Sequence, residues 1–193
     1  MLDLEKEKEL CLNCNKCKLS AQRTNVVFGI GSTDSPILFV GEGPGQQEDL
    51  EGEPFVGAAG KLLDDMLSII DLGRQNCYIA NIVKCRPPRN RDPEDEEIQA
   101  CLPWLREQIS ILRPKIIICL GRIAAGVLIH PDYHITKEHG TFVNQDGILL
   151  TSIYHPSALL RDYSKRPETF QDLLKIRSKI HEILPDFYES VSK

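Results

Sequence analysis

Short runs of consecutive apolar residues alternate along this chain with longer segments in which apolar residues recur every three or four positions. Three runs have the length of buried β-strands, at residues 37–40, 78–83 and 116–120. Three segments have helical spacing, from about Gly57, from Asp92 and from about Glu168. The alternation predicts an α/β fold, a three-layer α/β/α arrangement with a mainly parallel central sheet. A length of 193 residues suits one domain spanning residues 1–193.

Turn and cap residues refine this prediction. Asp146-Gly147 is a strong hairpin signal, and candidate strands flank it at residues 141–145 and 148–153. Asp92 has the side chain of a helix N-cap, and Pro93 suits the first helical position. We therefore expect a hairpin late in the chain and a helix that begins at Asp92.

Composition and charge narrow the class of protein. The net charge of −5 disfavours a protein that coats nucleic acid by bulk electrostatics, although a local basic face can still contact phosphates. No apolar run approaches the roughly 20 residues that cross a bilayer, and the charged N-terminus lacks a signal-peptide core. We expect a cytoplasmic, nucleoid-associated monomer that does not bind membranes.

Seven cysteines indicate a metal site more than disulfides in such a protein. Cys11, Cys14 and Cys17 form a C-x-x-C-x-x-C cluster, and Cys85 and Cys101 follow a strand and lie in a helix, respectively. The remaining two, Cys77 and Cys119, belong to apolar runs and are expected to be small buried side chains. The spacing favours a metal but does not choose between iron–sulfur and zinc.

Polar residues gather where predicted strands end, which is where parallel sheets bind ligands. Glu42 lies in the glycine-rich loop Gly41 to Gly45, Asn81 lies near the end of the next strand, and His155 follows the last. Carboxylates at Glu48 and Asp49 and the aromatic Phe55 complete the first loop, while Lys84, Arg86, Arg89 and Arg91 make a basic loop after the second strand. The sequence therefore predicts one site at this edge of the sheet.

The motifs resemble, in content and order, those of the uracil-DNA glycosylase superfamily, and most closely its iron–sulfur family 4. The resemblance covers nearly the whole chain. It rests on GEGPGQQED with PFVGAAGKLL, on YIANIVKCRPPRNRDP, on HPSALLR, and on the cysteines together with Arg23-Thr24. It implies an enzyme that flips uracil out of single- or double-stranded DNA and hydrolyses its N-glycosidic bond, leaving an abasic site for base excision repair.

The resemblance also implies a cofactor and residue roles. A [4Fe-4S] cluster would be bound by Cys14, Cys17, Cys85 and Cys101, with Cys11 outside the set. Phe55 would stack on the base, Asn81 would read its O4 and N3–H edge, and His155 would donate to O2.

Other implied roles concern water, selectivity and DNA. Glu42, or else Asp49, would handle water, because Gly43 stands where the best-known branch has aspartate. Glu48 would crowd the 5-methyl group of thymine. Leu159 would fill the vacated stack as a wedge. Phosphate contacts are expected from five cations: Lys84, Arg86, Arg89, Arg91 and Arg161.

Two alternatives and one partner remain open. A non-catalytic iron–sulfur electron carrier would need the cysteines but not Glu42, Asn81 and His155 together. A zinc-stabilised nucleic-acid-binding protein would show no visible thiolate-to-iron absorption after anaerobic purification. The C-terminal tail has the spacing of a sliding-clamp-binding peptide at His181, Leu184, Phe187 and Tyr188, although an ordinary amphipathic tail fits the same pattern.

Overall fold

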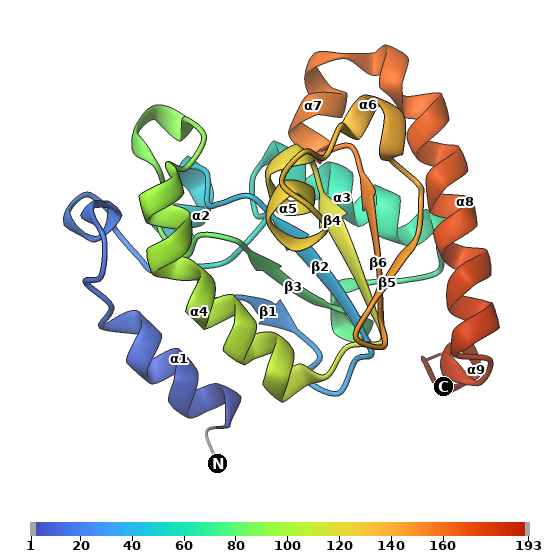
Figure 1. The fold of residues 1–193 in the computed structure, drawn as a ribbon, viewed down its shortest axis with the longest axis horizontal. Helices are drawn as coiled ribbons and strands as arrows, with labels where there is room; N and C mark the ends of the chain where they lie inside the picture. The colour runs from blue at the N-terminus through green and yellow to red at the C-terminus, as the bar shows by residue number, and fades with distance from the viewer. Residues whose placement is uncertain (1–2, 192–193) are drawn as a thin grey trace.

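One six-stranded sheet organises the computed structural model, which describes residues 3–191 (Figure 1). Its strands are β1 (Ile30–Gly31), β2 (Ile37–Gly41), β3 (Tyr78–Asn81), β4 (Ile116–Leu120), β5 (Val143–Gln145) and β6 (Ile148–Ile153). The spatial order is β1-β3-β2-β4-β6-β5. The four inner strands are parallel to one another, and each edge strand is antiparallel to the strand that it pairs with. The predicted mainly parallel sheet is confirmed.

Helices cover both faces of the sheet, which confirms the predicted three layers (Figure 1). One face packs against α1 (Leu4–Leu12), α4 (Asp95–Leu112) and α5 (Arg122–Leu128). The other packs against α3 (Ala58–Ile69), α7 (Pro156–Arg161) and α8 (Arg166–Ile183). The short helices are α2 (Gln46–Glu51), α6 (Ile135–Glu138) and α9 (Phe187–Val191).

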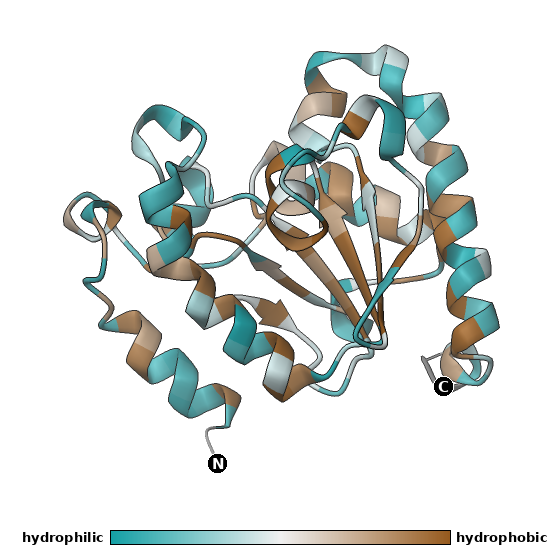
Figure 2. Cartoon of the chain, viewed as in Figure 1, coloured by the Kyte–Doolittle hydropathy of each residue, from teal (hydrophilic) through white to brown (hydrophobic). Residues whose placement is uncertain are grey.

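The strands are apolar throughout because both of their faces are covered. Every residue of β2 and β4 is buried, and successive side chains enter opposite cores. Leu38 and Val40 face the α4 side, whereas Ile37 and Phe39 face the α3 side. Figure 2 shows the result as hydrophobic strands between helices whose outer surfaces are hydrophilic.

Two local predictions have different outcomes. The hairpin is confirmed, since Asp146 and Gly147 both have positive φ, 52° and 85°, as its tight turn requires. The helix start at Asp92 is wrong. Glu94 is the N-cap of α4, in a capping box with Glu97, and Asp92 instead forms an ion pair with Arg122.

The C-terminal tail packs against the body of the protein. Tyr188 is buried, and its hydroxyl donates to the Ile70 carbonyl at 3.0 Å. Leu184 and Phe187 pack against the same core. Clamp binding stays a prediction, and it would require these side chains to leave their present positions. No helix in the described part of the chain is long and apolar enough to cross a membrane.

Candidate active site

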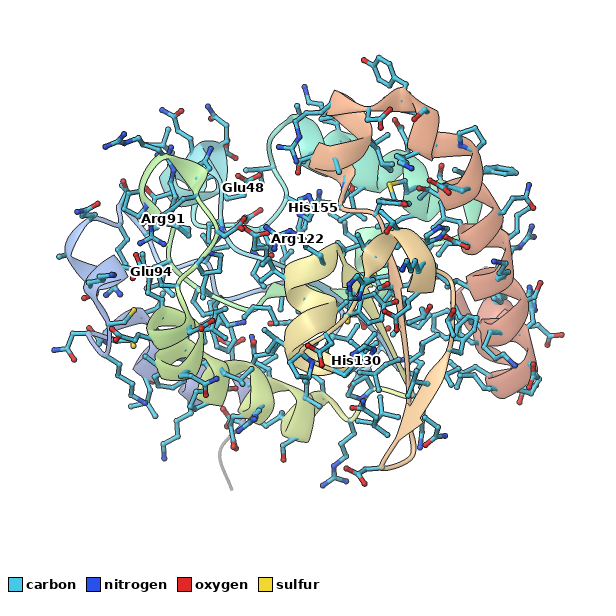
Figure 3. All side chains as sticks on the ribbon, turned by 45° about the horizontal axis from the view of Figure 1, so that its top comes forward. Glu48, Arg91, Glu94, Arg122, His130 and His155 are labelled. Carbon is cyan, nitrogen blue, oxygen red and sulfur yellow. The ribbon has the colours of Figure 1, made fainter. Side chains whose placement is uncertain are left out.

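A cleft of about 620 Å³ opens at the carboxyl ends of the parallel strands. Loops after β2, β3, β4 and β6 all contribute to it, because parallel strands end at the same edge. The predicted residues in its lining are Glu42, Gly43, Glu48, Phe55, Asn81, Arg91, His155 and Arg161. Figure 3 shows Glu48, Arg91, Arg122 and His155 around this region. Segments distant in sequence therefore form one site.

Asn81 supplies a buried polar group to this cleft. Its side chain is 2% exposed, and Oδ1 has no hydrogen-bond partner among the described residues. An unpaired buried acceptor costs about 1–3 kcal/mol, so its position facing a cleft favours recognition of a ligand donor. Gly41 permits this packing, because a Cβ there would lie 2.4 Å from Asn81 Oδ1 and 2.7 Å from Phe55 Cζ.

Phe55 has a strained backbone conformation that hydrogen bonds with the side chains of Glu48 and Arg74 hold in place. Its φ is +56°, which bulky residues rarely adopt. Glu48 Oε1 accepts hydrogen bonds from the Val56 and Gly57 amides at 3.0 Å each. Arg74 donates to the carbonyls of Pro54 and Phe55. These bonds fix the ring against His155, with ring centroids 5.6 Å apart.

His155 has a defined tautomer because its side chain caps α7. The Ser157 amide donates to Nδ1 at 3.1 Å, so Nδ1 is an acceptor and the proton of the neutral ring lies on Nε2. Burial, together with the nearby Arg161 cation, lowers the pKa of His155 to about 4. At neutral pH His155 therefore offers one N–H donor without carrying a charge.

Glu42 is the carboxylate that the structure places in the cleft lining at the end of β2. Burial, reinforced by the negative charge of Asp92, raises the pKa of Glu42 to about 7, while Arg122 and Arg161 oppose this shift. Its carboxyl group therefore changes charge near neutral pH. A group of this kind can accept a proton from water or face a developing cation.

Two predicted site residues lie elsewhere. Asp49 is buried outside the cleft lining, and its Oδ1 accepts hydrogen bonds from the Thr24 and Asn25 amides at 2.9 and 3.3 Å. These bonds anchor the N-terminal segment, so the role of Asp49 as a water-activating carboxylate is not supported. Leu159 is only 2% exposed and packs in the core on the α3 side. The wedge role of Leu159 stays a prediction, and it would require this side chain to leave its present position in the core.

The basic residues fall into different environments. Lys84 is 1% exposed, so the prediction that it contacts DNA phosphates is wrong. Arg91 lines the cleft but already forms a two-pronged ion pair with Glu97, at 2.8 and 2.7 Å. Arg89 and Arg161 are exposed, and half-buried Arg86 donates to Asn90 Oδ1 at 2.8 Å. Three arginines thus remain candidates for phosphate contacts without a strong internal pair.

Arg122 and Tyr154 also line the cleft, although no sequence motif predicted them as site residues. Arg122 comes two residues after the end of β4, and Tyr154 directly follows β6. Both positions follow from the rule that ligands lie at the carboxyl ends of parallel strands. Applying that rule to every predicted strand would have found them.

A second cavity lies between the N-terminal segment, the basic loop and α4. It is lined by Cys11, Cys14, Cys17, Cys85 and Cys101. Three N–H groups point at the sulfurs: Arg23 Nη1 lies 3.4 Å from Cys85, Trp104 Nε1 lies 3.3 Å from Cys14, and the Lys84 amide lies 3.2 Å from Cys101. Such donors stabilise thiolates bound to a metal cluster.

The chemistry of this cavity fits a thiolate-bound cofactor. Burial raises the pKa of Cys101 to about 11, so loss of its proton would require a bound cation. Among residues 3–191, no group of three or more His, Cys, Asp or Glu side chains is arranged to hold a single metal ion. The predicted set of four cysteines lies around one cavity, and buried Cys11 joins it as a fifth thiol.

Comparison with known proteins gives consistent matches over most of the chain. Residues 28–176 match the uracil DNA glycosylase superfamily. The chain is 47% identical to a type-4 uracil-DNA glycosylase of Sulfurisphaera tokodaii, covering 92% of this chain and 84% of the relative. It is 45% identical to the type-4 enzyme of Archaeoglobus fulgidus, covering 86% and 87%. It is 42% identical to that of Thermotoga maritima, covering 92% and 94%.

Proposed function

Because the chain belongs to the uracil DNA glycosylase superfamily, we propose that it hydrolyses the N-glycosidic bond of uracil in DNA and leaves an abasic site. The relatives named type-4 uracil-DNA glycosylase, at 42–47% identity, support this activity. The observation that carries the proposal for this chain is the unpaired, buried amide oxygen of Asn81 in a cleft that also contains a neutral histidine donor. The target base must leave the DNA stack to reach that depth.

Recognition of uracil follows from the chemistry of the Asn81 amide. Its oxygen can accept from N3–H of uracil, and its NH₂ group can donate to O4. Cytosine presents the opposite pattern, an acceptor at N3 and a donor at N4, so it would leave buried polar groups unpaired. Mismatches of this kind can support discrimination of about 10⁴–10⁵. Phe55 supplies an aromatic face for the flipped base.

His155 stabilises the departing base. As the glycosidic bond breaks, negative charge develops on the pyrimidine, including O2. The Nε2–H group of neutral His155 donates to that oxygen more strongly in the transition state than in the ground state, which lowers the barrier. Its Nδ1 stays engaged by the Ser157 amide, so the ring keeps this tautomer.

Glu42 acts on the sugar side of the reaction. Its ionised carboxylate stabilises positive charge that develops on the sugar and orients the water that attacks C1′. Gly43 leaves the loop without a second carboxylate at the adjacent position, so Glu42 carries this role alone. Glu48 lines the cleft beside Phe55 and crowds the position of a 5-methyl group, which disfavours thymine.

DNA would approach along the open side of the cleft, and both single- and double-stranded substrates are proposed. Arg86, Arg89 and Arg161 contact its phosphates, and Arg122 contributes once it exchanges Asp92 for a phosphate. These contacts hold the strand while the uracil rotates into the cleft.

We also propose a [4Fe-4S] cluster held by Cys14, Cys17, Cys85 and Cys101. When bound, the cluster supplies a covalent cross-link between three segments distant in sequence, and this stabilises the fold. The residues around it provide thiolates, N–H donors and burial. The loop after β3, which carries both Cys85 and the arginines, is thereby fixed to α4 beside the cleft.

Oligonucleotides test the activity directly. Purified protein is incubated with a strand containing one uracil and with a matched strand containing thymine, and alkali then cleaves any abasic site. We expect cleavage at the uracil position alone. Absence of cleavage with protein that has full iron content would contradict the proposed function.

A further inference from the structure

Lys84 is a buried cation between the cysteine site and the cleft. It directly precedes Cys85, and its own amide donates to Cys101 Sγ at 3.2 Å. The side chain is 1% exposed. A buried ammonium is costly unless it is hydrogen-bonded, so the partners of Nζ show what this residue does.

The ammonium group bridges the end of β3 to α4. Nζ donates to the main-chain carbonyl of Asn81 at 3.0 Å and to Gln108 Oε1 at 2.5 Å. The amide group of Gln108 then donates through Nε2 to the Phe28 carbonyl at 3.0 Å. The bonds form a buried connection from Asn81 through Lys84 and Gln108 to Phe28.

This connection lies where main-chain pairing between β1 and β3 stops. β1 pairs with β3 at Ile30↔Ile79 and Gly31↔Tyr78, and continuing that register would place Phe28 opposite Asn81. The pairing stops instead next to Gly29, whose φ is +150°. Two carbonyls cannot bond to each other, so the Lys84 and Gln108 side chains supply the donors that Phe28 and Asn81 need.

We propose, resting on the proposed function, that Lys84 is a positioning residue for uracil recognition. It fixes the main chain of Asn81, and it links that residue to the segment that carries Cys85 and contacts Cys101. The base-reading amide and the cysteine site are therefore coupled through one side chain, and disturbance of either end loosens Asn81.

The test compares Lys84→Met with Lys16→Met. Lys16 is an exposed cation that lines the same cysteine cavity, 4.5 Å from the ring centroid of Trp104, and it does not line the cleft that contains Asn81. Each variant is first assayed for iron content and circular dichroism. The readouts are the amide exchange of Ile82, whose N–H donates to the Gly41 carbonyl at 2.9 Å, and the inhibition constant of free uracil.

In Lys84→Met with its iron retained, we expect faster exchange at Ile82 and an inhibition constant raised by about threefold or more, because apparent affinity falls with the fraction of molecules in which Asn81 is correctly placed. Lys16→Met should change neither. A loss of folded protein alone would lower the amount of active enzyme but would leave the inhibition constant unchanged. Unchanged exchange and inhibition in iron-loaded Lys84→Met would overturn the proposal.

A second variant covers the case in which Lys84→Met loses its fold or its iron. Gln108→Met breaks the connection at its α4 end, because it removes the partners of Lys84 Nζ and of the Phe28 carbonyl, and it alters no neighbour of a cysteine ligand. The bond from Nζ to Asn81 stays but loses its support from α4, so faster exchange at Ile82 is again expected, and unchanged exchange would overturn the proposal. Because exchange needs no substrate, this result is independent of uracil excision, whose absence in the unmodified protein would contradict only the proposed function.

Discussion

At the scale of single residues, burial shifts the pKa values of Glu42 and His155 in opposite directions. Burial disfavours charge, so the pKa of the histidine falls to about 4 while that of the carboxyl rises to about 7. At neutral pH the histidine is a donor without a charge. The carboxyl group, in contrast, titrates within the physiological range. The cleft therefore contains an uncharged donor, His155, and a carboxyl group whose charge depends on pH, Glu42.

We predict that excision falls as pH drops below about 7, because Glu42 acts as a carboxylate and its protonated form predominates below its pKa. Titration of His155 should not change the excision rate near neutral pH, because the pKa of this residue is about 4. Single-turnover rates of the unmodified protein and of Glu42→Gln between pH 5 and pH 9 test this. Glu42→Gln should be slower by about 10²–10⁴, and its rate should no longer fall as the pH drops through 7. If the rate of the variant still falls near pH 7, a group other than Glu42 causes the fall.

At the scale of elements, apolar runs predicted the inner strands well because helices cover both faces of the sheet. β4 spans the predicted residues, and the convergence of Glu42, Asn81 and His155 followed from parallel strand ends. Failures came from side-chain direction. Lys84 and Leu159 occur in motifs with surface roles, yet both side chains point inward. The direction in which such a side chain points depends on tertiary packing, and the spacing of residues in the sequence does not determine it.

The cysteine site joins the N-terminal segment, the loop after β3 and α4. Replacement of its ligands should therefore affect both the visible absorbance and the stability of the protein. Cys85→Ala or Cys101→Ala should remove the brown chromophore and lower the midpoint of thermal unfolding, because ligand binding is coupled to folding. Iron content, visible absorbance and thermal unfolding measure these effects after anaerobic purification.

Two control variants separate ligands from other thiols. Cys119 is buried within β4 outside the cavity, and Cys11 lines the cavity outside the proposed set. Cys119→Ala and Cys11→Ala should retain the chromophore. Full iron content in Cys85→Ala, or loss of iron in Cys11→Ala alone, would change the assigned ligand set.

At the scale of the whole molecule, a net charge of −5 coexists with three arginines in the cleft lining, Arg91, Arg122 and Arg161. Carboxylates neutralise some of its arginines, as in the Arg91–Glu97 and Arg122–Asp92 pairs. Binding therefore depends on a few exposed cations and not on total charge. Electrostatic attraction to DNA should be modest and local.

Replacement of Arg86, Arg89 or Arg161 by glutamine should each reduce the salt slope of DNA binding by about one unit, because each phosphate contact releases counterions. Arg106 is exposed on α4 and belongs neither to the basic loop nor to α7, so it provides a control: Arg106→Gln should leave the slope unchanged. Titrations of labelled DNA at several salt concentrations give these slopes. Equal slopes in all four variants and the unmodified protein would show that the arginines are only solvated.

The most direct measurement of recognition by the cleft compares uracil and cytosine release by the unmodified protein and by Asn81→Asp. Asn90→Asp adds the same charge elsewhere in the cleft lining, beside Arg86, and controls for the effect of added charge alone. With folding and iron content confirmed, Asn81→Asp should excise uracil more slowly, because an ionised carboxylate would face O4. It should also release cytosine measurably, because the carboxylate accepts from N4. Uracil excision by Asn81→Asp at the unmodified rate, without cytosine release, would contradict the assignment of Asn81 to the base.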